Sequence, residues 1–260
     1  MKMIVSRVIA GLLLSAVLAA TALPAAAQSA EVKEKPRLYT YAGDWIIPRQ
    51  RWADMEKDNP ATQKIFDHAV ANGSVVAYGD SITLVHTADG PTHTGWWCAM
   101  SMAGLLNTLD EFYKSGSSVS PVLVSATKHW DEVYVSRFYN WHAGSVKGGY
   151  VHGATYLLKA DAPRNALETL SKNLFVPLFE KLVADGTVTA YQVAEQTIHT
   201  ADPNLFFIFF LTPNAEGLDK VAAATREAVA ANELAVPAIG SMVDFTPHRD
   251  YLARGNATFK

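Results

Sequence analysis

The sequence predicts an α+β protein built from two tandem copies of one unit, each with the order strand, helix, strand, strand, helix, strand. Three observations predict this class: a repeat at a fixed offset, the same succession of strand-like and helix-like periodicities in both copies, and turn glycines in register. The first copy with its tail is expected over 28–147 and the second over 148–260, after a separate N-terminal segment.

The repeat runs without gaps through the middle of each copy. The segment from Phe66 to Tyr78, FDHAVANGSVVAY, aligns with the segment from Phe179 to Tyr191, FEKLVADGTVTAY. This alignment, which places Phe66 on Phe179, defines the repeat offset. The same offset places the tetrapeptide HTAD at 86–89 onto HTAD at 199–202. Several matches that share one offset indicate a duplication rather than chance similarity.

The first strand and first helix of each copy follow from composition and periodicity. Tyr, Trp and Ile enrichment predicts strands over 38–47 and 150–158. In the second copy, leucines at i, i+4 and i+8 predict a helix over about 165–185, with a kink at Pro177. In the first copy, Pro60 after an asparagine indicates a helix that restarts there.

The remaining elements of each copy are two strands, a helix and a last strand in the tail. Turn-forming residues separate the two strands of each pair, and the last helices are rich in Ala, Lys and Glu. The expected strands are 74–86 and 94–102 in copy one and 187–199 and 205–211 in copy two. The expected helices are 104–114 and 215–232. The two tails share the pattern His-x-Asp, at 129–131 and 248–250.

The N-terminal segment 1–27 has the pattern of a secretory signal peptide. Lys2 and Arg7 precede an almost wholly apolar stretch, and small residues before Gln28 predict cleavage after Ala27. The alternative is an N-terminal membrane anchor, for which the apolar stretch is short. The sequence therefore predicts an exported protein, periplasmic or secreted, with no membrane span in its mature form.

Composition narrows the class of partner. The 260 residues are 49% hydrophobic and 18% charged, with a net charge of −3. Since no run of Lys or Arg is present, neither nucleic acid nor an acidic membrane surface is an expected partner. Cys98 is the single cysteine, which excludes an intramolecular disulfide, and its apolar neighbours indicate a buried, inert thiol.

The βαββαβ order is that of ferredoxin-like units. Two such units, paired sheet to sheet, resemble the dimeric α/β-barrel superfamily, which includes antibiotic-biosynthesis monooxygenase-like proteins. The resemblance covers Leu38 to the C-terminus and implies an α/β barrel with an inner pocket, closed here within one chain as a monomeric pseudo-dimer, or else a homodimer. Independent tandem domains are the alternative. The haem-degrading members of the superfamily have an Asn/Trp/His arrangement with the Asn on the first strand. The segment 38–47 has no Asn, so the haem assignment is not carried over to this chain, and no cofactor is expected.

Strand parity gives the candidate site. Tyr78, Asp80 and His86 share one face of their strand, and small residues such as Val75 and Ala77 share the other. We expect the small residues to lie under helices and the Tyr/acid/His face to line the barrel, unless a bulge at Gly79 breaks the parity. The predicted catalytic residues are His86, His199, Tyr78 and Tyr191, and the predicted ligand-binding residues are Tyr41, Trp45, Asp80, His152, Tyr156 and Glu195.

Each candidate has a simpler structural interpretation. The aromatic residues could be barrel packing, and the two histidines could belong to hairpin turns. His86 and His93 could meet across a hairpin, but copy two has Phe206 in place of His93 and metal-binding motifs are missing, so no metal site is expected. The tail residues could form either a polar rim or structural ion pairs: His129, Asp131, Arg137, His248, Asp250 and Arg254.

Three functions remain compatible with the sequence. The first is an exported enzyme acting on a small aromatic or enolisable compound in a barrel pocket, as a cofactor-independent oxygenase or isomerase. The second is a non-catalytic protein that binds a small molecule in the same pocket. The third is a structural or stress-related envelope protein whose barrel is filled. An accessible cavity would separate the first two from the third, and turnover would separate the first from the second.

Overall fold

Eight antiparallel strands form a closed barrel in the computed structural model, which describes residues 33–231 and 235–260. The strands are β1 Leu38–Ile46, β2 Ala77–Thr83, β3 His93–Ala99, β4 Lys128–Trp141, β5 Gly144–Leu158, β6 Ala190–Gln196, β7 Leu205–Thr212 and β8 Val243–Phe259. The first half has the order β4-β1-β3-β2 and the second the matching order β8-β5-β7-β6. Pairs β2–β8 and β4–β6 join the halves. The predicted α+β barrel is confirmed, while the signal peptide predicted over 1–27 lies outside the described residues.

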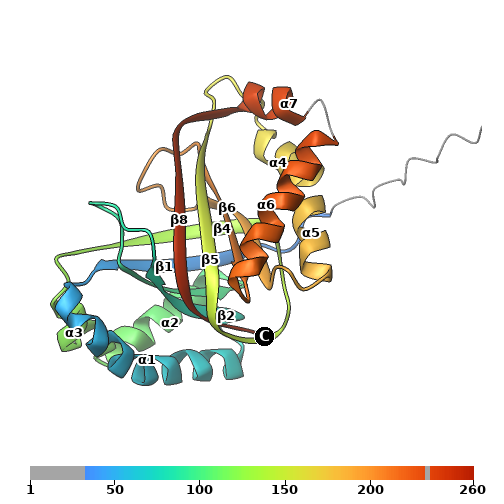
Figure 1. The fold of residues 1–260 in the computed structure, drawn as a ribbon. Coiled ribbons are helices and arrows are strands. Elements are labelled where there is room, and N and C mark those ends of the chain that lie inside the picture. The colour runs from blue at the N-terminus through green and yellow to red at the C-terminus, as the bar shows by residue number, and fades with distance from the viewer. Residues whose placement is uncertain (1–32, 232–234) are drawn as a thin grey trace, which may run out of the picture. The chain divides into compact units, whose positions relative to one another are not determined.

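Helices cover the outside of each half (Figure 1). Phe66 of the first helix stacks on Tyr78 of β2, and Phe179 stacks on Tyr191 of β6 in the equivalent place. Figure 1 shows the first-half helices α1 and α2 on a different side of the barrel from α5 and α6. The helical elements are η1 Arg49–Arg51, α1 Trp52–Asn72, α2 Met102–Lys114, η2 Ser117–Val119, α3 Pro121–Val124, α4 Ala166–Leu170, the π-turn η3 Ser171–Phe175, α5 Val176–Ala184, α6 Ala215–Ala230 and α7 Ala235–Met242.

Helix ends use the same chemistry in both halves. Gly73 ends α1 and Gly186 follows α5, with φ of 84° and 77°, a left-handed conformation that glycine adopts without a Cβ clash. The N-caps of α2 and α6 are also equivalent at the repeat offset: Ser101 Oγ accepts from the Gly104 amide at 3.1 Å and Asn214 Oδ1 accepts from the Gly217 amide at 3.0 Å.

The two proline predictions have different outcomes. Helix α1 runs continuously through Pro60, so the predicted restart there is wrong. Pro60 is exposed, so water can reach the backbone carbonyl that loses its helical partner. In the second half a π-turn, η3, ends at Phe175 and leads directly into α5, with the Val176 N–H donating to the Ser171 carbonyl, so the helical region changes its hydrogen-bond pattern just before Pro177; the predicted kink stays a prediction.

The halves share one barrel. The expected boundary at 147/148 falls inside β5, where a bulge lies between Val146 and Gly149 and Gly148 has a φ of 65°. All described residues belong to one compact unit, Val32–Lys260. Because strands of both halves pair at two seams, this arrangement differs from the alternative of independent tandem domains.

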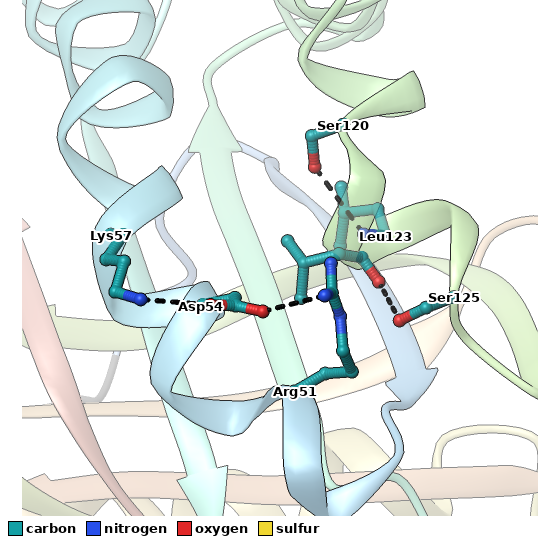
Figure 2. Close-up of polar contacts among 7 residues, drawn as sticks. Arg51, Asp54, Lys57, Ser120, Leu123 and Ser125 are labelled. Atoms are coloured by element: carbon teal, nitrogen blue, oxygen red, sulfur yellow. Dashed lines mark hydrogen bonds and ion pairs between the residues drawn. The ribbon is translucent and has the colours of Figure 1, made fainter.

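A short helix positions the start of β4. Ser120 caps α3 by accepting from the Leu123 amide at 3.5 Å, and Arg51 pairs with Asp54 at 3.0 Å at the start of α1. Figure 2 shows the start of α1 and the capped helix α3 next to each other, with the Arg51 guanidinium lying between them. This packing fixes the chain just before β4, whose side chains enter the barrel interior.

Candidate active site

The barrel encloses a cavity of about 340 Å³. Alternate residues of the strands line it, such as Thr40, Ala42 and Asp44 of β1 and Trp96 and Cys98 of β3. A cavity of this size is within the range that small organic ligands occupy in proteins. The filled barrel of the third functional hypothesis is therefore not what the structure shows.

The face that lines the cavity is the opposite of the one predicted. From β2 the cavity receives Ala77 and Ser81, whereas the hydroxyl of Tyr78 donates to Asp67 of α1 at 2.6 Å. Tyr191 borders the cavity, but its hydroxyl donates to Glu180 of α5 at 2.7 Å. Tyr78 therefore faces the covering helix instead of the cavity, whereas Tyr191 borders the cavity as predicted but has its hydroxyl held by a carboxylate of the covering helix.

A bulge does not explain the difference. Strand β2 pairs with both neighbours in continuous register from Ala77 to Ile82. A Cβ on Gly79 would lie 2.6 Å from the Trp96 ring, so this glycine makes room for a large side chain from the next strand. The small residues face inward because large residues of neighbouring strands already fill that part of the interior.

Most other predicted site residues also lie outside the cavity. Four are stacked in aromatic pairs on the outer face, two are in exposed turns, and two have other polar surroundings. The aromatic pairs, with ring centroids 4.2–4.9 Å apart, are Tyr41 on Trp97, Trp45 on His129, Tyr156 on His248 and His152 on Phe210. His86 and His199 are exposed. Asp80 accepts from Asn256 at 3.1 Å, and Glu195 borders an outer groove together with His199.

The tail residues form structural contacts on the outer face. His129 Nε2 lies 3.3 Å from Asp131, and His248 Nε2 lies 3.4 Å from Asp250 in the equivalent place. Arg137 pairs with Glu34 at 3.1 Å, and the Arg254 Nε donates to the Gly148 carbonyl at 3.2 Å. The Arg137–Glu34 ion pair and the Arg254–Gly148 hydrogen bond match the second of the two interpretations, since they hold the tails to other segments, whereas each His–Asp contact lies within one strand.

Asp44 is a cavity residue that the parity argument missed. The residue is 7% exposed, and its carboxylate accepts from Thr94 Oγ1 at 2.5 Å. Burial raises the pKa of Asp44 to about 7; the Thr94 hydrogen bond opposes this shift, and the nearby charges of Glu132 and Asp131 add to it. A carboxyl with such a pKa exchanges protons readily near neutral pH.

Glu132 is the second carboxylate of the cavity. It accepts from the Tyr134 hydroxyl at 2.5 Å and from Gln196 Nε2 at 2.9 Å. Burial raises the pKa of Tyr134 well above its usual value, so this phenol stays a hydrogen-bond donor. The two donors hold Glu132 in place beside Asp44, which it influences through its charge.

Hydroxyl groups extend the polar region from Asp44 across the cavity. Thr94 Oγ1 lies 3.3 Å from the Tyr251 hydroxyl, which lies 3.0 Å from Ser81 Oγ. All three residues line the cavity. With Asp44 they form a chain of donors and acceptors that ends on a carboxylate.

This polar region lies at one end of the barrel, here named the mouth. The antiparallel pairing brings the carboxyl ends of β1, β2, β5 and β6 to that end. At the opposite, deep end Leu38, Ala77 and Cys98 are almost fully buried, at 1%, 1% and 4% exposure, whereas Trp141 and Gln192 are partly exposed. Thr94 and Tyr251 at the mouth are also partly exposed.

The two halves contribute unequally to the mouth. In the strand pairing, Asp44 and Glu132 of the first half take the places that Thr155 and Tyr251 take in the second. Thr94 likewise corresponds to Phe207 at the repeat offset. Both acids therefore stand where the other half has neutral side chains, but Asp80 and Glu195 share that property outside the cavity, so it does not identify the site in the sequence.

Two further properties concern the described part of the chain. Within 33–231 and 235–260, no three His, Cys, Asp or Glu side chains come together as a group that could hold a metal ion. None of the helices in these ranges combines the length and apolar character that a membrane crossing needs.

Comparisons with known proteins show the fold. No family model matches the chain, and no curated protein matches it in sequence. A candidate monooxygenase from Lactobacillus acidophilus NCFM superposes with a TM-score of 0.61 at 11% identity, over 84% of this chain and 93% of that one. A candidate monooxygenase from Fusobacterium nucleatum subsp. nucleatum ATCC 25586 gives 0.59 at 7% identity, over 87% and 95%. The chain therefore shares its barrel fold with these two proteins.

Proposed function

We propose that this protein is an enzyme that binds a small aromatic or enolisable molecule in the barrel cavity and removes a proton from it, with Asp44 as the base. The observation that carries the proposal is a buried carboxylate, with a pKa of about 7, on the wall of a cavity that is otherwise largely apolar. Perturbed carboxyl groups in clefts of this kind are common in enzymes that transfer protons.

The surroundings of Asp44 suit this reaction. Trp96, Phe207 and Phe209 offer flat apolar surfaces for a ring system. The proton would pass from a phenolic O–H, or from a C–H beside a carbonyl, to the ionised Asp44 carboxylate. The Tyr251 and Ser81 hydroxyls lie next to this position and can donate to the oxygen on which negative charge develops.

The residues proposed for the reaction differ from those predicted from the sequence. Tyr78 and Tyr191 direct their hydroxyls to the helices, and His86 and His199 are exposed in turns. The next reaction of the resulting enolate distinguishes an oxygenase from an isomerase. Reaction with dioxygen gives a cofactor-independent oxygenase, and return of the proton to another atom gives an isomerase.

Hydrogen exchange into a simple ketone tests the proposal. 2-Tetralone carries acidic C–H groups between a carbonyl and an aromatic ring, and their exchange in D2O is followed by proton NMR. The protein should accelerate exchange, and Asp44→Asn should lower the rate about 100-fold or more. Asp67→Asn makes the same chemical change outside the barrel and should leave the rate unchanged. If the protein exchanges the 2-tetralone hydrogens no faster than buffer does, or if Asp44→Asn exchanges them as fast as the wild type, the proposed enzymatic activity is refuted.

A non-catalytic binding protein is the second candidate, since the same cavity would serve it. Titration with 2-tetralone distinguishes the two. Binding without any exchange above the buffer rate would favour the binding protein, whereas binding with exchange favours the enzyme. The cavity itself supports both candidates equally.

The proposal includes a duplicated, exported and monomeric chain. Duplication is supported by matching contacts at the repeat offset, such as the hydrogen bonds of Tyr78 to Asp67 and Tyr191 to Glu180. Export is supported by the signal-like segment 1–27, and N-terminal sequencing of protein from an exporting host should begin near Gln28. A monomer is supported by a barrel that closes within one chain, and sedimentation would detect a homodimer.

A further inference from the structure

The deep half of the cavity contains a second polar group. Thr40 Oγ1 lies 3.1 Å from Gln192 Nε2 and 3.2 Å from Gln192 Oε1, and it also contacts Cys98 Sγ at 3.2 Å. All three side chains line the cavity among apolar residues of the deep end. Burial raises the pKa of the Cys98 thiol to about 12, so the thiol stays protonated and is not a nucleophile.

Gln192 has hydrogen-bonding capacity left for a ligand. A carboxamide offers two N–H donors and two acceptor positions on its oxygen. Among the described residues, its hydrogen-bond partner is Thr40, and both amide atoms face that one hydroxyl. Polar atoms that face an apolar cavity are costly unless water or a ligand satisfies them.

The polar group exists once in the barrel, like the two acids at the mouth. Gln192 corresponds to Gly79 at the repeat offset, and the Trp96 ring lies over that glycine. Thr40 corresponds to Val151 by the first-strand offset that matches Trp45 with Tyr156. The scaffold therefore does not require an amide or a hydroxyl at these places, because its other half lacks both.

The spacing along β1 sets the length of a ligand that reaches both groups. Thr40 and Asp44 face the cavity from the same strand, four residues apart. At a rise of about 3.3 Å per residue this separates them by about 13 Å along the strand. Hydrogen bonds of about 2.8 Å, one to Asp44 and one to the Gln192 amide beside Thr40, leave about 8 Å between the polar atoms of the ligand. Ala42 lies between them, where its small side chain leaves room for a flat ring system.

We infer that Gln192, supported by Thr40, determines specificity, and that the substrate class is a rigid planar molecule with a polar oxygen at each end. The oxygen at the mouth belongs to the group that loses its proton to Asp44, and the oxygen at the deep end is held by the Gln192 amide. This inference depends on the proposed function for the use of the cavity, but it concerns the opposite end of the ligand.

Two naphthols measure the contribution of the deep end. 2,6-Dihydroxynaphthalene carries hydroxyls at both ends of two fused rings, and 2-naphthol carries one. Calorimetric titration of the whole protein should show the diol binding about tenfold more tightly, the effect of one additional hydrogen bond. Gln192→Leu should abolish this preference and leave the affinity for 2-naphthol within about twofold. Gln63→Leu makes the same change on the exposed surface of α1 and should preserve the preference.

The outcomes separate the inference from the proposed function. If neither naphthol binds the wild-type protein, the aromatic-binding cavity itself is refuted. If 2-naphthol binds but the diol binds no more tightly, or if Gln192→Leu keeps the preference, the deep-end inference is refuted and the proposed function stands. Should Gln192→Leu fail to fold by circular dichroism, Thr40→Val removes the supporting hydroxyl with little change in volume, and the same loss of preference is expected.

Discussion

Replacing the Asp44 carboxyl by an amide should stabilise the protein above neutral pH. Burial raises the pKa of Asp44 from 3.8 to about 7. At about 1.4 kcal/mol per pKa unit, ionising this group in the folded state costs about 4 kcal/mol. Between about pH 4 and about pH 7 the unfolded chain loses this proton more readily than the folded protein does. Wild-type stability therefore falls across that window as the pH rises.

Asp44→Asn has no charge to bury and should not show this fall. Thr94 can still donate to the amide oxygen, so the variant should match the wild type within about 1 kcal/mol near pH 4. Above about pH 8 the variant should be more stable by up to about 4 kcal/mol. A gain in stability accompanied by a loss of activity would be the expected sign of an active-site carboxylate.

Urea unfolding at a series of pH values measures this difference. The quantity of interest is the free energy of unfolding of the variant minus that of the wild type, because other titrating groups cancel in it. Asp67→Asn is the matched control, since Asp67 lies outside the barrel beside Tyr78. A variant-minus-wild-type difference that is the same at about pH 4.5 and about pH 8 would show that Asp44 ionises without penalty. The electrostatic basis for the proposed base would then be lost.

Three further predictions concern residues that the sequence singled out. His93 is 3% exposed, its Nε2 has no partner among the described residues, and burial lowers its pKa to about 4. Wild-type stability should therefore fall as the pH drops from about 6.5 to about 4, and His93→Phe, which copies Phe206 of the second half, should show a smaller fall in acid urea titrations. Tyr78→Phe should cost about 1 kcal/mol in unfolding free energy and leave 2-tetralone exchange unchanged; a large loss of exchange would instead restore Tyr78 to the site. Cys98 should resist iodoacetamide in the native protein and react once urea unfolds it, so rapid native labelling would contradict its raised pKa and burial.

Elements with strong local signals were predictable from the sequence. The order of strands and helices and the glycine ends at Gly73 and Gly186 follow from periodicity and from residues with unusual backbone freedom. The course of α1 through Pro60 was not predictable in this way. Tertiary packing of a long helix can outweigh the local cost of one proline.

The site was missed because strand parity tells which residues share a face but not which face turns inward. Ala77 and Tyr78 alternate on β2, and residue size suggested that the small side chains lie under helices. The interior instead receives its bulk from other strands, through Trp96, Phe207 and Phe209. Large side chains on one strand require small ones opposite. The face of β2 therefore depends on residues that only the folded barrel brings near it.

Comparing equivalent residues of the two halves distinguishes contacts that the barrel fold needs from residues that the fold does not need. Where the copies agree, as with Tyr78 and Tyr191 bonded to Asp67 and Glu180, the contact serves packing that both halves need. Where the interior differs in polarity, as with Asp44 against Thr155, packing cannot be the reason for the polar residue, because the other half folds without it. Burying Asp44 also costs stability, which a scaffold would avoid. Asp44 and Thr94 therefore stand at positions where the two halves of the barrel differ.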